Sequence, residues 1–286
     1  MKLRIGTRGS KLALAQTKLV AERLEKEGYE VEIKTIKTAG DVMKDRPLHE
    51  FKGMGAFVRA IDTALANGEI DVAVHSYKDV PSQRVPGTKI SAVLKRDSPC
   101  DALISRNGEK LEELCENAKL GTSSLRRRAQ FSRLRKDLVF ENLRGNLDTR
   151  LRKLREGLYD AIIVAEAGIQ RLGLRMDYQS FPPDLIVPPP NQGIIAVATR
   201  EGEEELVSFM NDQETWLSAQ VERTIAKELG FGCAVPFGVY AELKANKVRV
   251  ICEILAGKYL RIEETLERDS ALNEAIEMAR KLKHEG

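Results

Sequence analysis

The sequence is poor in the residues that build metal centres and disulfide frameworks. It has four cysteines and three histidines among 286 residues, and no Cys-x-x-Cys pair. This composition favours neither a zinc site nor a disulfide scaffold. We therefore predict a functional site that contains no metal.

Long hydrophobic runs are also missing. No apolar run approaches the roughly 18 residues that indicate a membrane span, and residues 1–6 enter a strand pattern directly rather than a signal peptide. Hydrophobic residues make up 42% of the chain and charged residues 31%, which is typical of a globular protein with a sizeable core. We expect a cytoplasmic protein with no membrane partner.

The charge is unevenly distributed along the chain. Residues 1–190 contain 34 Lys and Arg against 26 Asp and Glu, whereas residues 191–286 contain 12 against 17. A net charge of +8 followed by one of −5 suits an anionic ligand bound by the first two thirds, although it also suits a solvated basic face.

Alternating strand and helix patterns predict the fold class. Strand patterns at 3–6, 31–36 and 71–75 alternate with helical patterns at 11–27 and 56–67. The same alternation of strand and helix begins again at Ala102. Prolines at 182–183 and 188–190 predict an extended crossing between two lobes. Strand patterns and a helix after residue 236 predict a C-terminal antiparallel α+β domain. The expected domains are 1–94 plus 191–211, 95–190 and 212–286.

The stretch 71–81 places polar side chains at the end of a strand. Apolar residues lead into Ser76, Lys78 and Asp79 before Pro81 ends the element. Ligands bind at the carboxyl ends of strands in open α/β sheets, so this stretch is the first candidate site. A polar, glycine-bearing segment at 38–55 is expected to be a lid.

A second candidate lies at a predicted helix start. Thr122, Ser123 and Ser124 precede Arg126 and Arg127, so free backbone N–H groups, hydroxyls and guanidinium forks could bind an anion. The alternative is a basic face exposed to solvent. The next helix has the predicted apolar stripe Leu147, Leu151, Leu154 and Leu158. Arg150 lies at the edge of this stripe, whereas Arg152 points away from it.

The cysteines differ in their surroundings. Cys252 alternates with apolar strand residues and Cys115 shares a helical stripe with Leu111, so both are expected in the core. Cys100 follows Pro99 in a polar turn. Cys233 lies on a glycine-bearing loop that Pro236 ends, and its pattern leaves open whether the residue is structural or reactive.

Six motifs together resemble the hydroxymethylbilane synthase, or porphobilinogen deaminase, family. They occur in order along nearly the whole chain. They are Thr7-Arg8-Gly9-Ser10-Lys11-Leu12-Ala13 with Gln16, His75-Ser76-Tyr77-Lys78-Asp79-Val80-Pro81, residues 121–127, Leu143-Arg144-Gly145-Asn146 with Thr149-Arg150, Ala167-Gly168 with Arg171-Leu172-Gly173, and Gly232-Cys233-Ala234-Val235-Pro236.

The resemblance implies both a fold and an activity. The fold is α/β, with two periplasmic-binding-protein-like (type II) lobes of mixed, mainly parallel sheets and a C-terminal α+β domain with a three-stranded antiparallel sheet. The enzyme joins four porphobilinogen molecules head to tail on a covalent dipyrromethane primer, releases ammonia at each step, and then hydrolyses off linear hydroxymethylbilane. The family expectation is a monomer.

The resemblance also implies roles for individual residues. Cys233 matches the cysteine that carries dipyrromethane, and Asp79 matches a carboxylate that stabilises positive charge on the pyrroles, with Lys78 beside it. The remaining positions supply donors to acetate and propionate groups. The implied cofactor contacts are Ser76, Lys78, Asp79, Thr122, Ser123, Ser124, Arg126, Arg127, Arg144 and Gly145, and the implied substrate contacts are Arg8, Ser10, Gln16, Arg144, Arg150, Ala165 and Arg171.

The chain departs from the family pattern in the expected lid. Met54 stands where the family usually has a lysine, and Lys52 or Arg59 is a candidate to compensate. Ala198 stands near the end of a strand where the family commonly has a glutamate.

Two other classes of function are weighed against the enzyme. A two-lobed, non-enzymatic anion-binding protein would explain the basic lobes and the proline crossings, but not Cys233 or Asp79. An RNA-binding protein would use the basic stretch 124–135, yet Phe131 is the only aromatic residue there and no nucleic-acid motif accompanies it.

Overall fold

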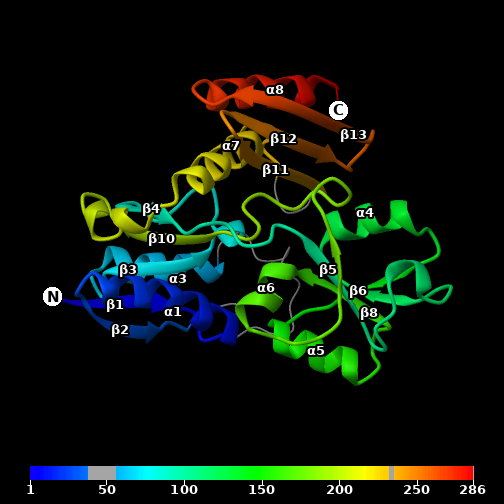
Figure 1. The fold of residues 1–286 in the computed structure, drawn as a ribbon, viewed down its shortest axis with the longest axis horizontal. Coiled ribbons are helices and arrows are strands. Elements are labelled where there is room, and N and C mark those ends of the chain that lie inside the picture. The colour runs from blue at the N-terminus through cyan, green and yellow to red at the C-terminus, as the bar shows by residue number, and fades with distance from the viewer. Residues whose placement is uncertain (38–55, 232–234, 286) are drawn as a thin grey trace. The chain divides into compact units, whose positions relative to one another are not determined.

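The computed structural model describes residues 1–37, 56–231 and 235–285 (Figure 1). The chain divides into two compact units. Unit 1 comprises Met1–Asp97 and Gly193–Leu217, and unit 2 comprises Ser98–Gln192 and Ser218–Gly286. The C-terminal strands therefore group with unit 2, and the first residues of one long helix, α7 (Gln213–Leu229), belong to unit 1.

Unit 1 is built on a five-stranded sheet of order β2-β1-β3-β10-β4. Strands β1, β2 and β3 are parallel, and β10 runs antiparallel to both β3 and β4. Four strands thus share one direction and β10 opposes them. The elements are β1 (Lys2–Thr7), α1 (Lys11–Lys26), β2 (Glu30–Thr35), α3 (Ala56–Ala66), β3 (Val72–Ser76), η2 (Tyr77–Asp79), β4 (Thr88–Val93), β10 (Ile195–Arg200), η4 (Glu204–Leu206) and η5 (Ser208–Met210).

Helices cover both faces of this sheet because successive strand residues point to opposite sides. Helix α1 packs through Val20 and Leu24 onto the face that carries Val72 and Val74. Helix α3 packs onto the opposite face; the residues of this second core include Ile61, Leu65, Ala73 and Ala198. The result is a three-layer α/β arrangement.

Unit 2 contains a second five-stranded sheet with the equivalent order, β7-β6-β8-β5-β9. Strands β6, β7 and β8 are parallel, and β5 runs antiparallel to β8 and β9. Again one strand opposes four. The elements are β5 (Asp101–Ser105), η3 (Leu111–Glu113), β6 (Lys119–Gly121), α4 (Leu125–Leu134), β7 (Val139–Glu141), α5 (Leu147–Arg155), β8 (Ala161–Ala165), α6 (Glu166–Arg171) and β9 (Gln179–Phe181).

The last part of unit 2 is a three-stranded antiparallel sheet, β11-β12-β13. Helix α8 packs along this sheet (Figure 1). The bounds are α7 (Gln213–Leu229), β11 (Phe237–Lys244), β12 (Lys247–Ile254), β13 (Leu260–Glu267) and α8 (Ala271–Glu285). Two mixed, mainly parallel sheets and this antiparallel one confirm the predicted fold class.

The sequence pattern missed several short elements. Strands β4, β5, β6, β7 and β9 have three to six residues each, too few to give a clear period. Leu158, which the pattern placed in the stripe of the helix that begins at Leu147, lies beyond the end of α5 and is 51% exposed.

Candidate functional site

Unit 1 gathers predicted site residues at one edge of its sheet. Strands β1 and β3 are parallel neighbours, so their carboxyl ends meet at the same edge. Arg8 and Ser10 follow β1, while Lys78 and Asp79 follow β3. Ser10 caps helix α1, where its side chain accepts a hydrogen bond from the backbone N–H of Ala13 at 3.2 Å.

A hydrogen bond joins the two segments at this edge. The amide Nε2 of Gln16, on α1, lies 2.9 Å from Oγ of Ser76, the last residue of β3. Gln16 is buried, which leaves its amide few partners other than this hydroxyl. Gln16 therefore connects α1 to the end of β3, and its role as a substrate contact stays a prediction.

The chain turns immediately after Ser76. Tyr77 is buried, its N–H donates to the carbonyl of Ile194 at 2.9 Å, and the N–H of Val80 donates back to the carbonyl of Tyr77 at 3.1 Å. This single 3₁₀ turn leaves the side chains of Lys78 and Asp79 exposed. A basic and an acidic residue are therefore adjacent and exposed at the end of β3.

A buried ion cluster lies beside this turn. Nε2 of His75 and Nη2 of Arg84 lie 2.9 and 2.8 Å from the same carboxylate oxygen of Asp62. The motif included His75, but the sequence analysis assigned no role to Asp62 or Arg84. A usable signal existed, because Asp62 interrupts the apolar face of its helix and His75 interrupts the apolar face of its strand.

Unit 2 presents a similar edge. Strands β6, β7 and β8 are parallel, so the segments after them lie at one edge of the sheet. Three groups of predicted residues follow these strands. They are Thr122, Ser123 and Ser124 after β6, Arg144 and Gly145 after β7, and Ala165 at the end of β8.

The hydroxyl residues before α4 bond to nearby groups of the protein. Ser124 caps the helix by accepting from the N–H of Arg127 at 3.4 Å, and Thr122 accepts from the N–H of Ser124 at 3.2 Å. Ser123 donates to the carbonyl of Leu143 at 3.0 Å. The last bond connects the β6 segment to the segment that carries Arg144.

Arg126 and Arg127 are buried, unlike the solvent-facing arginines that a ligand site usually offers. Nη2 of each lies 2.7 Å from one oxygen of Asp101, whose side chain is fully buried. Burial alone would raise the pKa of Asp101, but the charges of both arginines outweigh it and hold that pKa well below its usual range. The two predicted cofactor contacts are thus engaged with a carboxylate of the protein.

The Asp101 cluster includes Gln192, after which the chain returns to unit 1. Nε2 of Gln192 donates to Asp101 at 2.9 Å and to the carbonyl of Pro99 at 2.8 Å. Next to it, Glu222 accepts from the N–H of Asn191 at 2.5 Å. Asp101 and Glu222 were not predicted as site residues, because a single acidic residue at a strand start or within a helix gives no recognisable sequence pattern.

Three further arginines are half-buried in unit 2. Arg150 donates through Nε to the carbonyl of Gly145 at 2.8 Å. Arg144 lies next to Gly145, and Arg171 ends α6. Gly145 has φ of +110°, and a Cβ there would lie 2.8 Å from Cγ2 of Thr149, so glycine is required at this turn. Arg152 is exposed, as predicted, and pairs with Glu156.

The cysteines divide by burial. Cys252 is fully buried, and burial raises the pKa of its thiol to about 12. The prediction for Cys115 was wrong: it follows the short η3 turn rather than lying inside a helix, and it is exposed. Cys233 and Met54, together with the predicted lid 38–55, lie outside the described residues. Within the described ranges, no three His, Cys, Asp or Glu side chains could hold a metal ion together.

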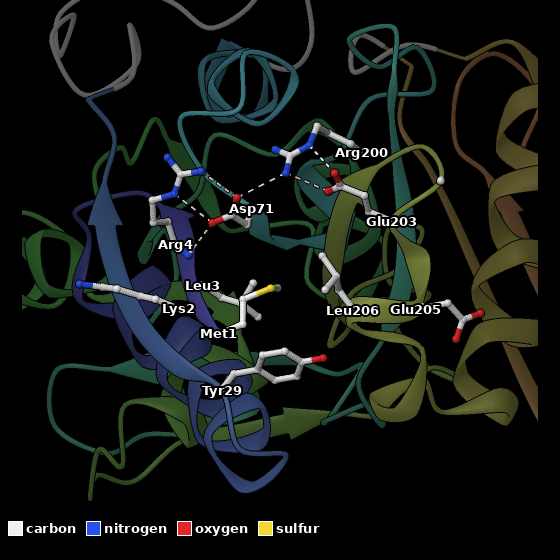
Figure 2. Close-up of a pocket in the computed structure, with 11 residues that line it drawn as sticks. Met1, Lys2, Leu3, Arg4, Tyr29, Asp71, Arg200, Glu203, Glu205 and Leu206 are labelled. Atoms are coloured by element: carbon white, nitrogen blue, oxygen red, sulfur yellow. Dashed lines mark hydrogen bonds and ion pairs between the residues drawn. The ribbon is translucent and has the colours of Figure 1, made fainter.

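A cavity of about 530 Å³ lies in unit 1, lined by residues from the amino-end side of the sheet (Figure 2). Four of its charged groups pair with one another: Arg4 and Arg200 contact Asp71 at 2.8 and 3.3 Å, and Arg200 contacts Glu203 at 2.9 Å. The predicted site residues follow the carboxyl ends of β1 and β3 instead, and none of them lines this cavity.

Comparison with known proteins identifies the family. Residues 3–208 match the model "Porphobilinogen deaminase, dipyromethane cofactor binding domain", and residues 216–285 match "Porphobilinogen deaminase, C-terminal domain". The chain belongs to the porphobilinogen deaminase family. No helix in the part of this family member that the structure describes is long and apolar enough to cross a membrane.

Curated relatives of the porphobilinogen deaminase family span the whole chain. A probable porphobilinogen deaminase of Archaeoglobus fulgidus is 71% identical over 100% of this chain and 99% of its own length. One of Methanosarcina mazei is 49% identical over 98% of this chain and 90% of its own length. The motif resemblance and the similarity to these relatives therefore both cover the two units.

The residues present in unit 2 fit the family's dipyrromethane cofactor. Its pyrrole rings carry acetate and propionate groups, which require cationic and hydroxyl donors. Half-buried Arg144, Arg150 and Arg171 lie in or beside the segments that follow the strands, together with Ser123. The donor set is thus of the right chemical kind.

Proposed function

We propose that this chain is a hydroxymethylbilane synthase. It condenses four porphobilinogen molecules head to tail, releases one ammonia for each, and adds one water to release the linear hydroxymethylbilane. The observation that carries this proposal is the exposed Lys78–Asp79 pair at the end of β3, in a chain of this family.

Asp79 is assigned to the reacting centre. Loss of ammonia from porphobilinogen leaves positive charge on the pyrrole, and a fixed carboxylate stabilises that charge as it develops. The same carboxylate can accept and return a proton. Lys78, its neighbour on the turn, supplies a positive charge for a pyrrole carboxylate, and Arg8 and Ser10 add donors after β1.

The residues of unit 2 bind carboxylates in this proposal. Arg144, Arg150 and Arg171 provide guanidinium groups that bind carboxylates in two places at once. Ser123 and Thr122 supply hydroxyls, and Ala165 and Gly145 supply backbone groups. Arg126 and Arg127, because Asp101 engages them, act by fixing the start of α4 and by adding positive potential.

Cys233 is assigned as the attachment point of dipyrromethane through a thioether. The bound primer supplies the position to which the first substrate is joined. Among the other cysteines, Cys252 is buried with a pKa raised to about 12, which makes it a poor nucleophile. Burial also raises the pKa of the Cys100 thiol.

A two-lobed, non-enzymatic anion-binding protein is the alternative, and it is not favoured. Anion binding alone gives no use for an exposed carboxylate at the edge where the basic residues of unit 1 gather. We also propose a cytoplasmic monomer, with porphobilinogen as its small-molecule substrate and no nucleic-acid partner. The three-domain division 1–94 plus 191–211, 95–190 and 212–286 remains our proposal for the domains.

Turnover tests this proposal directly. Purified protein incubated with porphobilinogen should consume it and release ammonia in a 1:1 ratio, with four ammonia per hydroxymethylbilane. Asp79→Asn should retain the fold and lose most of this turnover. Tight binding of porphobilinogen without ammonia release would favour the non-enzymatic alternative.

A further inference from the structure

Asp62 is a buried acid that the proposed chemistry does not use. It lies on α3, and its side chain is only 1% exposed. Its carboxylate oxygen Oδ1 contacts Nε2 of His75 at 2.9 Å and Nη2 of Arg84 at 2.8 Å. Both partners are also largely buried, at 3% and 10% exposure.

The two partners of Asp62 flank the turn that carries Asp79. His75 is in β3, one residue before the strand ends, and Arg84 lies beyond Pro81. One side chain on α3 therefore contacts the chain both before and after the turn Tyr77–Asp79. A connection of this kind limits how far the turn can shift.

The strand geometry explains why this pair forms. Side chains alternate across a strand, so Ala73 and His75 point to the face covered by α3. Ser76 points to the other face, where Gln16 of α1 contacts it. Each of the last two residues of β3 is thus held by a different helix.

His75 and Arg84 place two nitrogen groups against one carboxylate oxygen of Asp62. Arg84 is a permanent cation, and a carboxylate beside it gains from the charge–charge attraction. An ionised carboxylate only accepts hydrogen bonds, so the hydrogen lies on Nε2 of His75. The pair of contacts depends on the negative charge and not only on the shape of the side chain.

We propose that Asp62 is a positioning residue for Asp79, which it holds in place through His75 and Arg84. It touches neither substrate nor primer. The proposal rests on the proposed function, since it assumes that Asp79 takes part in the reaction. A displacement of the reacting group by about 1 Å can cost on the order of 100-fold in rate, so a small loosening of this turn is enough to matter.

Asp62→Asn tests the proposal because the amide keeps the shape and removes the charge. We expect kcat for ammonia release to fall about 10- to 100-fold, with KM changed less than about 3-fold, because the carboxylate-binding residues stay in place. Asp62→Glu restores the charge and should recover part of kcat. A purely structural role would not produce this split between kcat and KM.

Asp71→Asn is the matched control. Asp71 immediately precedes the same strand, also pairs with two arginines, and lies at the opposite end of β3 from Asp79. It should lose thermal stability while retaining kcat. Equal losses of kcat in the Asp62 and Asp71 variants would overturn the proposal, because they would reflect general destabilisation.

A double-mutant cycle separates this proposal from the proposed function. The measured quantity is the residual rate at which porphobilinogen units add to the protein's intact mass. If Asp62 acts through Asp79, Asp62→Asn should cause no further loss of this rate in an Asp79→Asn background. The same fold loss in both backgrounds would overturn the positioning role. Near-normal turnover of Asp79→Asn alone would instead refute the role of Asp79.

Arg84→Gln provides a second route if Asp62→Asn does not fold. It removes the charged contact beyond the turn and leaves the Asp62–His75 pair intact. We expect a smaller loss of kcat in the same direction, again absent in the Asp79→Asn background. Unchanged kcat in a folded Arg84→Gln protein would contradict the proposal.

Discussion

Asp71 and Asp160 occupy equivalent places in the two five-stranded sheets. Each follows a glycine of positive φ by three residues, and each exchanges backbone and side-chain hydrogen bonds with the strand alongside. Oδ2 of Asp71 accepts from the N–H of Arg4 at 2.9 Å, and Oδ2 of Asp160 accepts from the N–H of Lys119 at 2.8 Å. The weak sequence similarity between 68–74 and 157–163 thus reflects the same junction built twice.

The two acids differ in their ion pairs, which predicts different sensitivity to substitution. Arg4 and Arg200 both contact Asp71, which is 14% exposed, whereas Asp160 has Arg106 at 3.4 Å and is 32% exposed. Asp71→Asn should lower the free energy of unfolding by about 1–2 kcal/mol at pH 7. Asp160→Asn should cost less. Denaturant unfolding measures both, and the reverse order would contradict the account.

The contribution of Asp71 to the stability of the folded state should also disappear in acid. The hydrogen bond from Arg4 is the main cause that lowers the pKa of Asp71 to about 2, against an ordinary value of about 3.9. A lowered pKa stabilises the folded state above the unfolded value and loses that effect as the pH falls through the folded value. The stability difference between wild type and Asp71→Asn should therefore be complete above about pH 5 and vanish towards pH 2. A difference that stays constant over this range would disprove the ion-pair explanation.

Substitution of Asp101 is predicted to lower the free energy of unfolding much more than substitution of Asp71. Asp101→Asn leaves Arg126 and Arg127 buried without their counter-charge, which typically costs about 3–5 kcal/mol. The exposed Arg152–Glu156 pair supplies the control, because Glu156→Gln should change stability by less than about 0.5 kcal/mol. Chemical denaturation gives both values. A loss of under 1 kcal/mol for Asp101→Asn would mean that solvent reaches the two arginines.

The burial of Arg126 and Arg127 illustrates what sequence patterns can and cannot provide. Hydroxyls before a basic run correctly located the start of α4, which Ser124 caps in the structure. The pattern could not reveal that Asp101, 25 residues earlier, engages both arginines, because a long-range partner leaves no local period. Asp62 could be predicted only in part. The sequence shows that it lies on an apolar helix face, but its partners depend on how α3 packs against β3.

The short strands were not predicted for a related reason. Long elements such as α1 and α3 were located within one or two residues because their apolar period repeats over several turns. Strands β6, β7 and β9 have three residues each and are defined by pairing with neighbours rather than by their own composition. The misplacement of Cys115 followed from extending a helical period through a segment that forms only the short η3 turn.

Gly145→Ala should damage both stability and turnover. The new Cβ would meet Thr149 at a φ of +110°, and backbone strain of this kind costs about 1–3 kcal/mol. The shift would move Arg144 and the carbonyl that Arg150 contacts. Gly108→Ala is the control: its φ is +88°, but nothing lies within 4 Å of a Cβ there. Equal turnover in the two variants would argue against a role for the 144–150 segment.

In the proposed function, Cys233 carries a two-ring pyrrole primer from which the tetrapyrrole grows. The intact mass of the purified protein, followed by peptide mapping of the adduct, tests this assignment. We expect a mass that exceeds that of the 286-residue chain by two pyrrole units, located on Cys233, and further stepwise increases after brief exposure to porphobilinogen. A mass equal to the bare chain that does not increase with porphobilinogen, or an adduct located on Cys100, would contradict it.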